Sequence, residues 1–363
     1  MELLFWAAAL LVGFTYAGYP LWVWGQSRWR PRPVRRGEGN CRISIVVAAR
    51  NEAAALPAKL RNLHALDYPP ALREIIVVSD GSTDGTNALL AAQHDARSIV
   101  LERAQGKAAA LNRGMQAAQG DVVVFTDARQ PIEAGALRAL LRNFSDPDVG
   151  AVSGELMLAG GGGLGLYWEL EKKVREWESA GGSTVGATGA LYAVRRELLH
   201  PLPEGTILDD VYLPMEVARQ GKRVLFEPEA RAQDTLSSER HEFRRKVRTL
   251  TGNYQLLQLA PWLLTAANPL RFRFVCHKLL RLAVPFALAV LLVSSLAAPA
   301  PFYRTVFGLQ CAFYGLAVFA GWGGRPFVLG RAAAVSRSFL LLNTAAALAL
   351  VYFMRGKRAV WLR

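Results

Sequence analysis

Cysteine is scarce in this chain of 363 residues: three copies, Cys41, Cys276 and Cys311, stand far apart. They form no CxxC pair, so the sequence offers neither a disulfide framework nor a zinc site and fits a reducing compartment. Acidic residues are also few, 29 Asp and Glu against 43 Lys and Arg, which gives a formal net charge of +14. An excess of this size can indicate a nucleic-acid partner. No recognised nucleic-acid module accompanies it, so we expect no nucleic acid.

Much of the positive charge instead follows a long apolar stretch near the start of the chain. The segment Leu3–Trp24 is long enough, at about 1.5 Å per residue, to cross the hydrocarbon core of a bilayer. A cleaved signal peptide is the alternative, but the positive n-region is missing and the basic cluster comes afterwards. We therefore predict a transmembrane helix over residues 1–27, with the following residues on the cytoplasmic side. The basic cluster comprises Arg28, Arg30, Arg32, Arg35 and Arg36.

Three further apolar stretches fill the C-terminal part, Leu279–Ala298, Phe302–Trp322 and Ser338–Met354. Their lengths and flanking residues favour membrane spans over a soluble helix bundle, so we predict about three transmembrane helices within 275–363. Residues 236–274 would form basic and interfacial amphipathic helices, among them Leu256–Leu264. Anionic lipid would attract the basic residues before the first of these spans, Arg271, Arg273, Lys278 and Arg281. The side of the membrane that holds the C-terminal residues stays open.

Strands and helices alternate between residues 40 and 235, as expected for a doubly wound α/β sheet with parallel strands. Continuous apolar runs indicate three strands buried on both faces, Ile43–Ala48, Ile75–Val78 and Val122–Thr126. Polar residues follow each run, and ligands bind to such sheets outside the carboxyl ends of the strands. We therefore expect a ligand site at the edge that carries Arg50, Glu52, Asp80 and Asp127.

Turn and capping roles are the alternatives for some of these residues. Asp80 and Asp84 precede the predicted helix Asn87–Gln93, and we assign the capping role to Asp84 alone. Lys107 follows Gly106 at the start of another predicted helix, where it adds a cation to the positive end of the helix dipole and can meet phosphate. A solvated surface lysine is the alternative reading of Lys107.

Five motifs in a fixed order carry a family resemblance: VVAARNE, VVSDGSTDGT, GKAAALN, FTDA and LDD. Together they resemble the processive family 2 glycosyltransferases, membrane enzymes with a GT-A fold such as the cellulose, hyaluronan and poly-N-acetylglucosamine synthases. The resemblance covers Ile43 to Thr249 and extends to the order of the membrane spans. It implies a Rossmann-like GT-A domain over residues 40–235, inserted between transmembrane helices. The protein would be a multi-pass protein of the cell inner membrane with a cytoplasmic catalytic domain.

The resemblance also implies roles for the donor side of the site. The nucleotide base would lie against Ala48, Arg50 and Glu52, with Asp80 contacting the base or ribose and Lys107 beside the nucleotide. Asp127 is the first carboxylate of the family's DxD motif, which binds the diphosphate through a divalent metal, Mg²⁺ or Mn²⁺.

On the acceptor side, Asp210 stands at the position of the family's general base, with Asp209 before it. A pair of N-cap residues is the alternative there, more so for Asp209. Gly189 belongs to the acceptor-side loop. The family's QxxRW motif, which binds the diphosphate and the acceptor end, is matched by Arg245–Thr249, with Arg248 preserved. A basic face that touches lipid headgroups is the alternative for this segment.

Two motifs depart from the family pattern. The DxD motif reads Asp127-Ala128-Arg129, so a guanidinium replaces the second carboxylate. Either Asp127 alone holds the metal while Arg129 turns aside into a salt bridge, or Arg129 reaches the diphosphate itself. We favour a metal-dependent site with weakened metal affinity. The loss of Gln and Trp from QxxRW puts polymerisation in question more than transfer itself.

We therefore expect inverting transfer of a sugar from a nucleotide-sugar donor, a UDP-sugar, to a lipid-linked or growing saccharide acceptor in envelope or extracellular polysaccharide synthesis. Such transfer needs a carboxylate to take the acceptor proton and positive charge to hold the departing diphosphate. Single transfer to a polyprenyl phosphate is one alternative. A catalytically silent nucleotide-sugar-binding subunit is another, favoured by Arg129 and opposed by Asp210 and Lys107. Membrane lipids and synthase subunits would be further partners.

Overall fold

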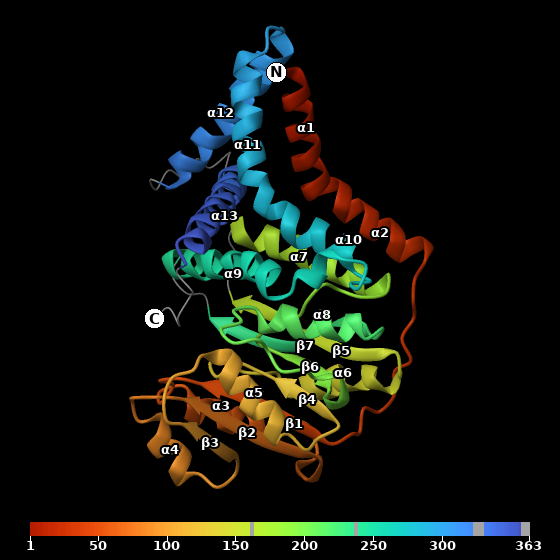
Figure 1. The fold of residues 1–363 in the computed structure, drawn as a ribbon, viewed down its shortest axis with the longest axis vertical. Helices are drawn as coiled ribbons and strands as arrows, with labels where there is room; N and C mark the ends of the chain where they lie inside the picture. Colours follow the sequence, from red (N-terminus) through yellow and green to blue (C-terminus); the bar gives the residue numbers. More distant parts are fainter. Residues whose placement is uncertain (160–162, 236–238, 322–329, 357–363) are drawn as a thin grey trace.

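The computed structural model describes residues 1–159, 163–235, 239–321 and 330–356. Figure 1 shows two regions: a sheet with helices on both faces at one end, and long helices that extend away from it at the other. Helices α7 (Gly163–Ala180) and α9 (Glu239–Leu259) lie between the sheet and these long helices.

Four parallel strands form one half of the sheet, in the order β3-β2-β1-β4. Their bounds are Ile43–Ala49 for β1, Arg73–Asp80 for β2, Arg97–Leu101 for β3 and Val122–Phe125 for β4. Alternate residues of β1 enter two different cores: Val46 packs with α5 (Lys107–Ala117), and Ile45 packs with α3 (Leu56–His64). Because both faces of the strand are covered, the sequence shows an unbroken apolar run, and the predicted parallel strands are confirmed here.

The other half of the sheet is mixed, so the prediction of parallel strands throughout was wrong. Strand β6 (Tyr192–Arg195) runs antiparallel between β4 and β5 (Val149–Ala159), and β7 (Arg223–Thr235) pairs parallel with β5 at the edge. The reversal pairs Phe125 with Tyr192. The loop before β6 is thereby brought beside the carboxyl end of β4, where the hydroxyl of Thr126 donates to the carbonyl of Ala190 at 2.7 Å.

Three short helices complete the cover of the sheet. Helix α8 (Asp209–Arg219) packs on the same face as α5, while α6 (Ala136–Leu141) shares the opposite face with α3. Helix α4 (Thr86–Ala92) follows β2.

The predicted interfacial helix Leu256–Leu264 is not formed. Helix α9 continues to Leu259 and is followed by a short 3-10 turn that begins at Pro261. Leu256 and Leu263 are buried in the core shared with α8, and the guanidinium of Arg219 lies 4.9 Å from the Trp262 ring centroid. This segment therefore packs on the domain, because the apolar side chains have a protein core within reach.

Three of the described helices are long and apolar enough to cross a membrane: Glu2–Trp29, Arg271–Ala297 and Ala332–Met354. The first joins α1 (Glu2–Gly13) to α2 (Tyr19–Trp29) through a π-helical turn, and the second joins α10 (Arg271–Phe274) to α11 (Leu280–Ala297) in the same way. The third lies within α13 (Gly330–Met354). The predicted span Phe302–Trp322 forms α12 (Pro301–Gly321), which is not among these candidates, and Trp322 lies outside the described residues.

Two arginines that we expected to face lipid headgroups contact protein instead. Arg273 donates to the carbonyl oxygens of Glu178 at 2.7 Å and Gly181 at 2.9 Å. Arg281 forms an ion pair with Glu171, with Nη1 2.6 Å from Oε2. Since Glu171 and Glu178 belong to α7, these contacts fasten the second long helix to the helix layer above the sheet.

Candidate functional site

A lysine and three carboxylates meet at the edge of the sheet, in what we call the sheet-edge cluster (Lys107, Asp127, Asp209 and Asp210). Lys107 is the first residue of α5, and its Nζ lies 3.0 Å from Oδ1 of Asp127 and 3.2 Å from Oδ1 of Asp209. Burial opposes the charge of Lys107, but the three carboxylates outweigh it and raise the pKa of the lysine above its ordinary value. The ammonium group is therefore a fixed positive charge, and the surface alternative for Lys107 does not hold.

Asp80 holds the loop that precedes this lysine. Its side chain is fully buried and accepts hydrogen bonds from the backbone amides of Gln105 at 2.6 Å and Gly106 at 2.9 Å. Gly106 has a φ of +96°, which favours glycine, and it directly precedes Lys107. In this structure both oxygens of Asp80 hold the loop that presents Lys107, and the contact with base or ribose stays a prediction.

Asp84 has a local turn role, but the predicted capping role is wrong, because the N-cap of α4 is Gly85. One oxygen accepts the backbone amide of Thr86 at 3.0 Å, at the start of α4, and the other accepts the amide of Ala53 at 3.1 Å. The aspartate therefore ties the start of the helix to the loop after β1.

Asp210 lies in the first turn of α8, and its Oδ2 accepts the backbone amide of Gly189 at 3.0 Å. Burial and the neighbouring charge of Asp209 raise the pKa of Asp210 to about 6, although Lys107 opposes the shift. Asp209 has two other partners. Its Oδ2 accepts a hydrogen bond from the hydroxyl of Tyr192 at 3.0 Å, and its Oδ1 forms the ion pair with Lys107. The N-cap of α8 is Leu208, so neither aspartate caps the helix with its side chain.

Gly189 lies at the centre of the sheet-edge cluster. A Cβ atom added to it would lie 3.6 Å from Oδ2 of both Asp127 and Asp210, and 3.7 Å from Nζ of Lys107. The backbone of this loop thus borders the donor-side and the acceptor-side carboxylates at once.

Arg129 turns away from the cluster, and its Nε lies 2.9 Å from both carboxylate oxygens of Glu52. This is the first of the two arrangements that the sequence allows for Arg129. Asp127 remains half-buried as the acidic residue of the motif, with Oδ1 bonded to Lys107. The described residues hold no group of three or more His, Cys, Asp or Glu that could bind a metal by themselves. A divalent ion would fit only if the donor diphosphate and water completed its shell around Asp127, as Mg²⁺ commonly permits.

The remaining base-side residues are close to the sheet edge. Ala48 is buried in β1, and Arg50 follows the strand as a half-buried side chain. Neither forms a contact that defines a base pocket in the described structure, so both assignments stay predictions.

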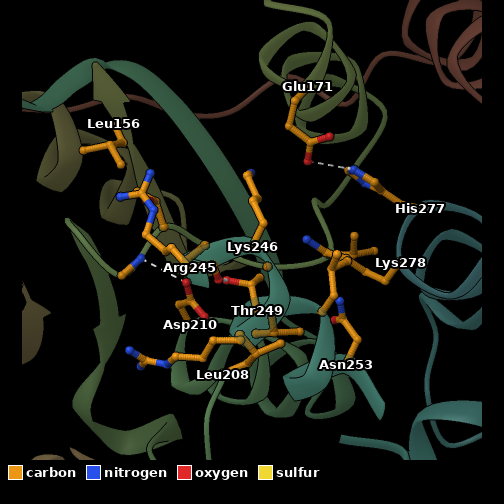
Figure 2. Close-up of a pocket in the computed structure, with 18 of the residues that line it drawn as sticks. Leu156, Glu171, Leu208, Asp210, Arg245, Lys246, Thr249, Asn253, His277 and Lys278 are labelled. Atoms are coloured by element: carbon orange, nitrogen blue, oxygen red, sulfur yellow. Dashed lines mark hydrogen bonds and ion pairs between the residues drawn. The ribbon is translucent and has the colours of Figure 1, made fainter. Parts of the chain in front are cut away.

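A cavity of about 330 Å³ opens from the sheet-edge cluster toward the long helices. Figure 2 shows Asp210 and Arg245 on one side of it, the Glu171–His277 pair across from them, and Lys246 and Lys278 between. Tyr16, Asn343 and Ala346, from two of the candidate membrane spans, also line it. The site therefore joins the edge of the sheet to the part of the protein that is long and apolar enough to enter a membrane.

The basic segment of α9 divides its side chains between protein contacts and the cavity. Arg245 pairs with Asp234, with Nη1 2.9 Å from Oδ2, and with Glu242, with Nη2 2.9 Å from Oε2. Arg248 is half-buried and lines the cavity, whereas Arg244 is exposed. Arg248 is thus placed to meet a ligand, while the charge of Arg245 is already balanced.

Several residues of the cavity were not predicted from the sequence: Arg175, Glu171, Lys246, His277 and Lys278. Lys246 lies within the segment matched to QxxRW, and its Nζ is 4.0 Å from the Trp168 ring centroid. Lys246 and Trp168 are far apart in the sequence. Only the packing of α7 against α9 brings the two side chains together.

In a comparison with protein-family models, residues 44–202 match the model "Glycosyl transferase family 2". The chain carries a glycosyl transferase family 2 domain. The matched region begins within β1, contains Asp80, Lys107 and Asp127, and ends before the acidic pair at the start of α8.

Curated relatives share this domain. The chain is 30% identical over 188 residues to a beta-monoglucosyldiacylglycerol synthase of Nostoc sp., covering 47% of this chain and 40% of the relative. It is 35% identical over 116 residues to a poly-beta-1,6-N-acetyl-D-glucosamine synthase of Staphylococcus aureus, covering 31% and 28% of the two chains. The matches thus span less than half the length of these relatives.

A solved structure resembles the fold over almost the whole chain. It is a mannosyltransferase from Pyrobaculum calidifontis in complex with GDP-Man and Mn²⁺, with a TM-score of 0.74 at 24% sequence identity. The likeness covers 98% of this chain and 99% of the other. It shows a GT-A type fold in which the long helices accompany the glycosyltransferase domain.

Proposed function

We propose that this protein transfers a sugar, with inversion, from a nucleotide-sugar donor to a hydroxyl of an acceptor held at the membrane. The observation that carries the proposal is the convergence of Asp210, Asp127 and Lys107 on Gly189: a Cβ atom there would lie 3.6 Å from Oδ2 of each aspartate and 3.7 Å from Nζ of the lysine. A base and a cationic diphosphate site thus border the same small space. This arrangement suits a reaction in which a sugar lies between donor phosphate and acceptor hydroxyl.

Asp210 would act as the general base. A pKa of about 6 leaves its carboxylate ionised at neutral pH and still basic enough to accept a proton in the transition state. The bond between the anomeric carbon and the donor phosphate oxygen breaks as the bond to the acceptor oxygen forms. The hydroxyl proton passes to Asp210, and the nucleoside diphosphate leaves with the electron pair.

Lys107 and Arg248 would stabilise the charge that develops on the leaving diphosphate. Lys107 is held by Asp127 and Asp209 and needs no rearrangement to present its charge. A divalent ion at Asp127, when bound, would supply further positive charge to the same phosphates. The pair between Arg129 and Glu52 keeps the guanidinium away from this ion, which limits their repulsion.

We also propose a topology with three membrane spans: Glu2–Trp29, Arg271–Ala297 and Ala332–Met354. With the N-terminal residues outside, the glycosyltransferase domain would be cytoplasmic, and the third span would return the chain to the cytoplasmic side. The position of the third span supports this, because Met354 and Gly356 border one cavity together with Glu204 and Gln255 of the domain region. Arg355, which follows this span, would then face the cytoplasm, and the protein would reside in the cell inner membrane.

A panel of radiolabelled nucleotide sugars tests the function. Membranes containing the full chain are incubated with each UDP-sugar and with GDP-Man, and label is followed into lipid-extractable and polymeric products. We expect transfer from one donor, with a UDP-sugar as the first candidate, and products extended by one or a few sugars. Donor binding without transfer or hydrolysis would instead favour the silent-subunit alternative that Arg129 raised.

A further inference from the structure

Three cations at the membrane side of the cavity lack an acidic partner. We call Arg175, Lys246 and Lys278 the membrane-side cations; they come from α7, α9 and the π-helical turn before α11. Within the described part of the chain, none forms an ion pair with a carboxylate. Arg175 donates to the hydroxyl of Ser153 at 2.6 Å and lies over Phe226, and Lys246 lies over Trp168.

Burial makes this arrangement of unpaired cations unfavourable. It lowers the pKa of Arg175, and burial together with the charge of Arg245 lowers the pKa of Lys246 to about 8. Partly buried charges are normally paired, because leaving water costs free energy that a partner must offset. A cluster of unpaired cations in a cavity is therefore a sign of an anionic ligand.

The acidic residues nearby have other partners. Glu242 pairs with Arg245 at 2.9 Å, Glu155 with Lys172 at 2.6 Å and Glu178 with His277 at 2.8 Å. Glu171 is occupied on both oxygens, by His277 at 2.9 Å and by Arg281 at 2.6 Å. Asp210 accepts the amide of Gly189 and has to remain free for the acceptor proton under the proposed function. The missing negative charge must therefore come from outside the chain.

The lining of the cavity indicates which kind of anion it is. Asp210 lines it, and so do Tyr16, Asn343 and Ala346 of the candidate membrane spans. The membrane-side cations line the same cavity, and Figure 2 shows two of them, Lys246 and Lys278, in one view with Asp210. A molecule that fills it would place an apolar tail among the long helices, a charged group at the cations and a polar end at Asp210.

We propose that the membrane-side cations bind the phosphate or diphosphate of an amphiphilic acceptor whose free hydroxyl faces Asp210. The inference rests on the proposed function for the identity of that acceptor as the sugar-receiving substrate. The phosphate is an anchor and not the nucleophile, because a phosphate oxygen brings no proton at neutral pH that a base would have to remove. The substrate class is thus a phosphate-bearing lipid with a hydroxyl, such as a lipid-linked saccharide.

Binding measurements on the full chain in dodecyl maltoside test the site without any need for turnover. Dodecyl phosphate serves as the phosphate-bearing amphiphile, inorganic pyrophosphate as the free anion and UDP as the donor diphosphate, each titrated by calorimetry. We expect dodecyl phosphate to bind more tightly than pyrophosphate. Lys246→Met and Lys278→Met should each weaken it about tenfold, as expected when a charge-assisted contact is lost.

Matched variants separate this site from general effects of charge. Lys173→Met removes an exposed lysine of α7 that pairs with Glu176, and it should leave the Kd for dodecyl phosphate unchanged. Lys246→Arg keeps the charge and should retain binding, and thermal unfolding checks that all variants fold. UDP should bind equally well to all of them.

The possible outcomes decide between the sources of the anion. Loss of UDP binding in the Lys246 and Lys278 variants would assign the cations to the donor and overturn the proposal. Equal binding of pyrophosphate and dodecyl phosphate would overturn the amphiphilic part, and unchanged dodecyl phosphate binding in both variants would overturn the site. If the site binds as expected while no sugar is transferred from any donor, the proposed function fails and the phosphate site stands.

Discussion

Arg129 and Glu52 form an ion pair at the edge of the sheet, with Nε of the arginine 2.9 Å from both carboxylate oxygens. The pair decides how the altered Asp127-Ala128-Arg129 motif is arranged. Glu52 holds the guanidinium aside, and Asp127 keeps its contact with Lys107. A single carboxylate of the motif is then left for a divalent ion.

The metal requirement follows from this arrangement. We expect transfer to rise with millimolar Mg²⁺ or Mn²⁺, and Arg129→Asp to lower the metal concentration that gives half-maximal activity, because a second hard oxygen ligand is restored. Arg138→Asp is the control, since Arg138 forms a comparable surface pair with Asp67 at 2.9 Å, away from the cluster. Full activity in excess EDTA would contradict a metal-dependent site.

The buried carboxylate of Asp80 should matter through Lys107. Asp80→Asn puts an amide donor against one of the backbone N–H groups of Gln105 and Gly106, which leaves that group unpaired. We expect a loss of about 1–3 kcal/mol in unfolding free energy and a clear fall in transfer rate. Thermal unfolding and donor titration measure the two effects, with the exposed Asp95→Asn as control. Unchanged stability would show that the loop does not depend on this carboxylate.

The pH profile should report Asp210. Because burial and Asp209 raise its pKa to about 6, kcat/KM should fall as the pH drops below about 6, where the base becomes protonated. The raised pKa also means that ionised Asp210 lowers stability at neutral pH relative to acid. Asp210→Asn should therefore unfold at the same temperature as the parent protein, or higher. A profile that stays flat to pH 4 would place the base elsewhere.

The basic segment of α9 gives a paired comparison. Arg248→Ala should slow transfer by about tenfold or more, since a charged contact to phosphate would be lost at the cavity. Arg244→Ala should change the rate little, because its side chain is exposed. Steady-state rates of both variants at saturating donor provide the test. Equal and severe loss in both would mean that the segment acts as a whole.

Much of the fold could be predicted because its causes are local. The parallel strands β1, β2 and β4 contain unbroken apolar runs since both of their faces are covered, and a polar residue follows each run toward the ligand edge. Lys107 could be found in the same way, as the residue after a glycine at a helix start.

The parts that could not be predicted depend on packing between distant segments. Strand β6 has four residues, and nothing in its sequence shows that it runs antiparallel to β4. This direction places the preceding loop, with Gly189, beside Asp127. The contact of Asp80 with the loop before Lys107 likewise joins residues 25 positions apart. In the sequence Lys278 appeared as membrane-flanking charge and Lys246 as part of the segment matched to QxxRW, and only the fold places them in one cavity.

The most direct test of the account compares the parent protein with Asp210→Asn in donor binding and in transfer from the radiolabelled donor. The amide keeps the size of the carboxylate and can still accept the hydrogen bond from Gly189. The account predicts unchanged donor affinity with transfer reduced by roughly 10²–10⁴, the range for loss of a general base. Transfer at a normal rate by Asp210→Asn, with normal donor affinity, would contradict it.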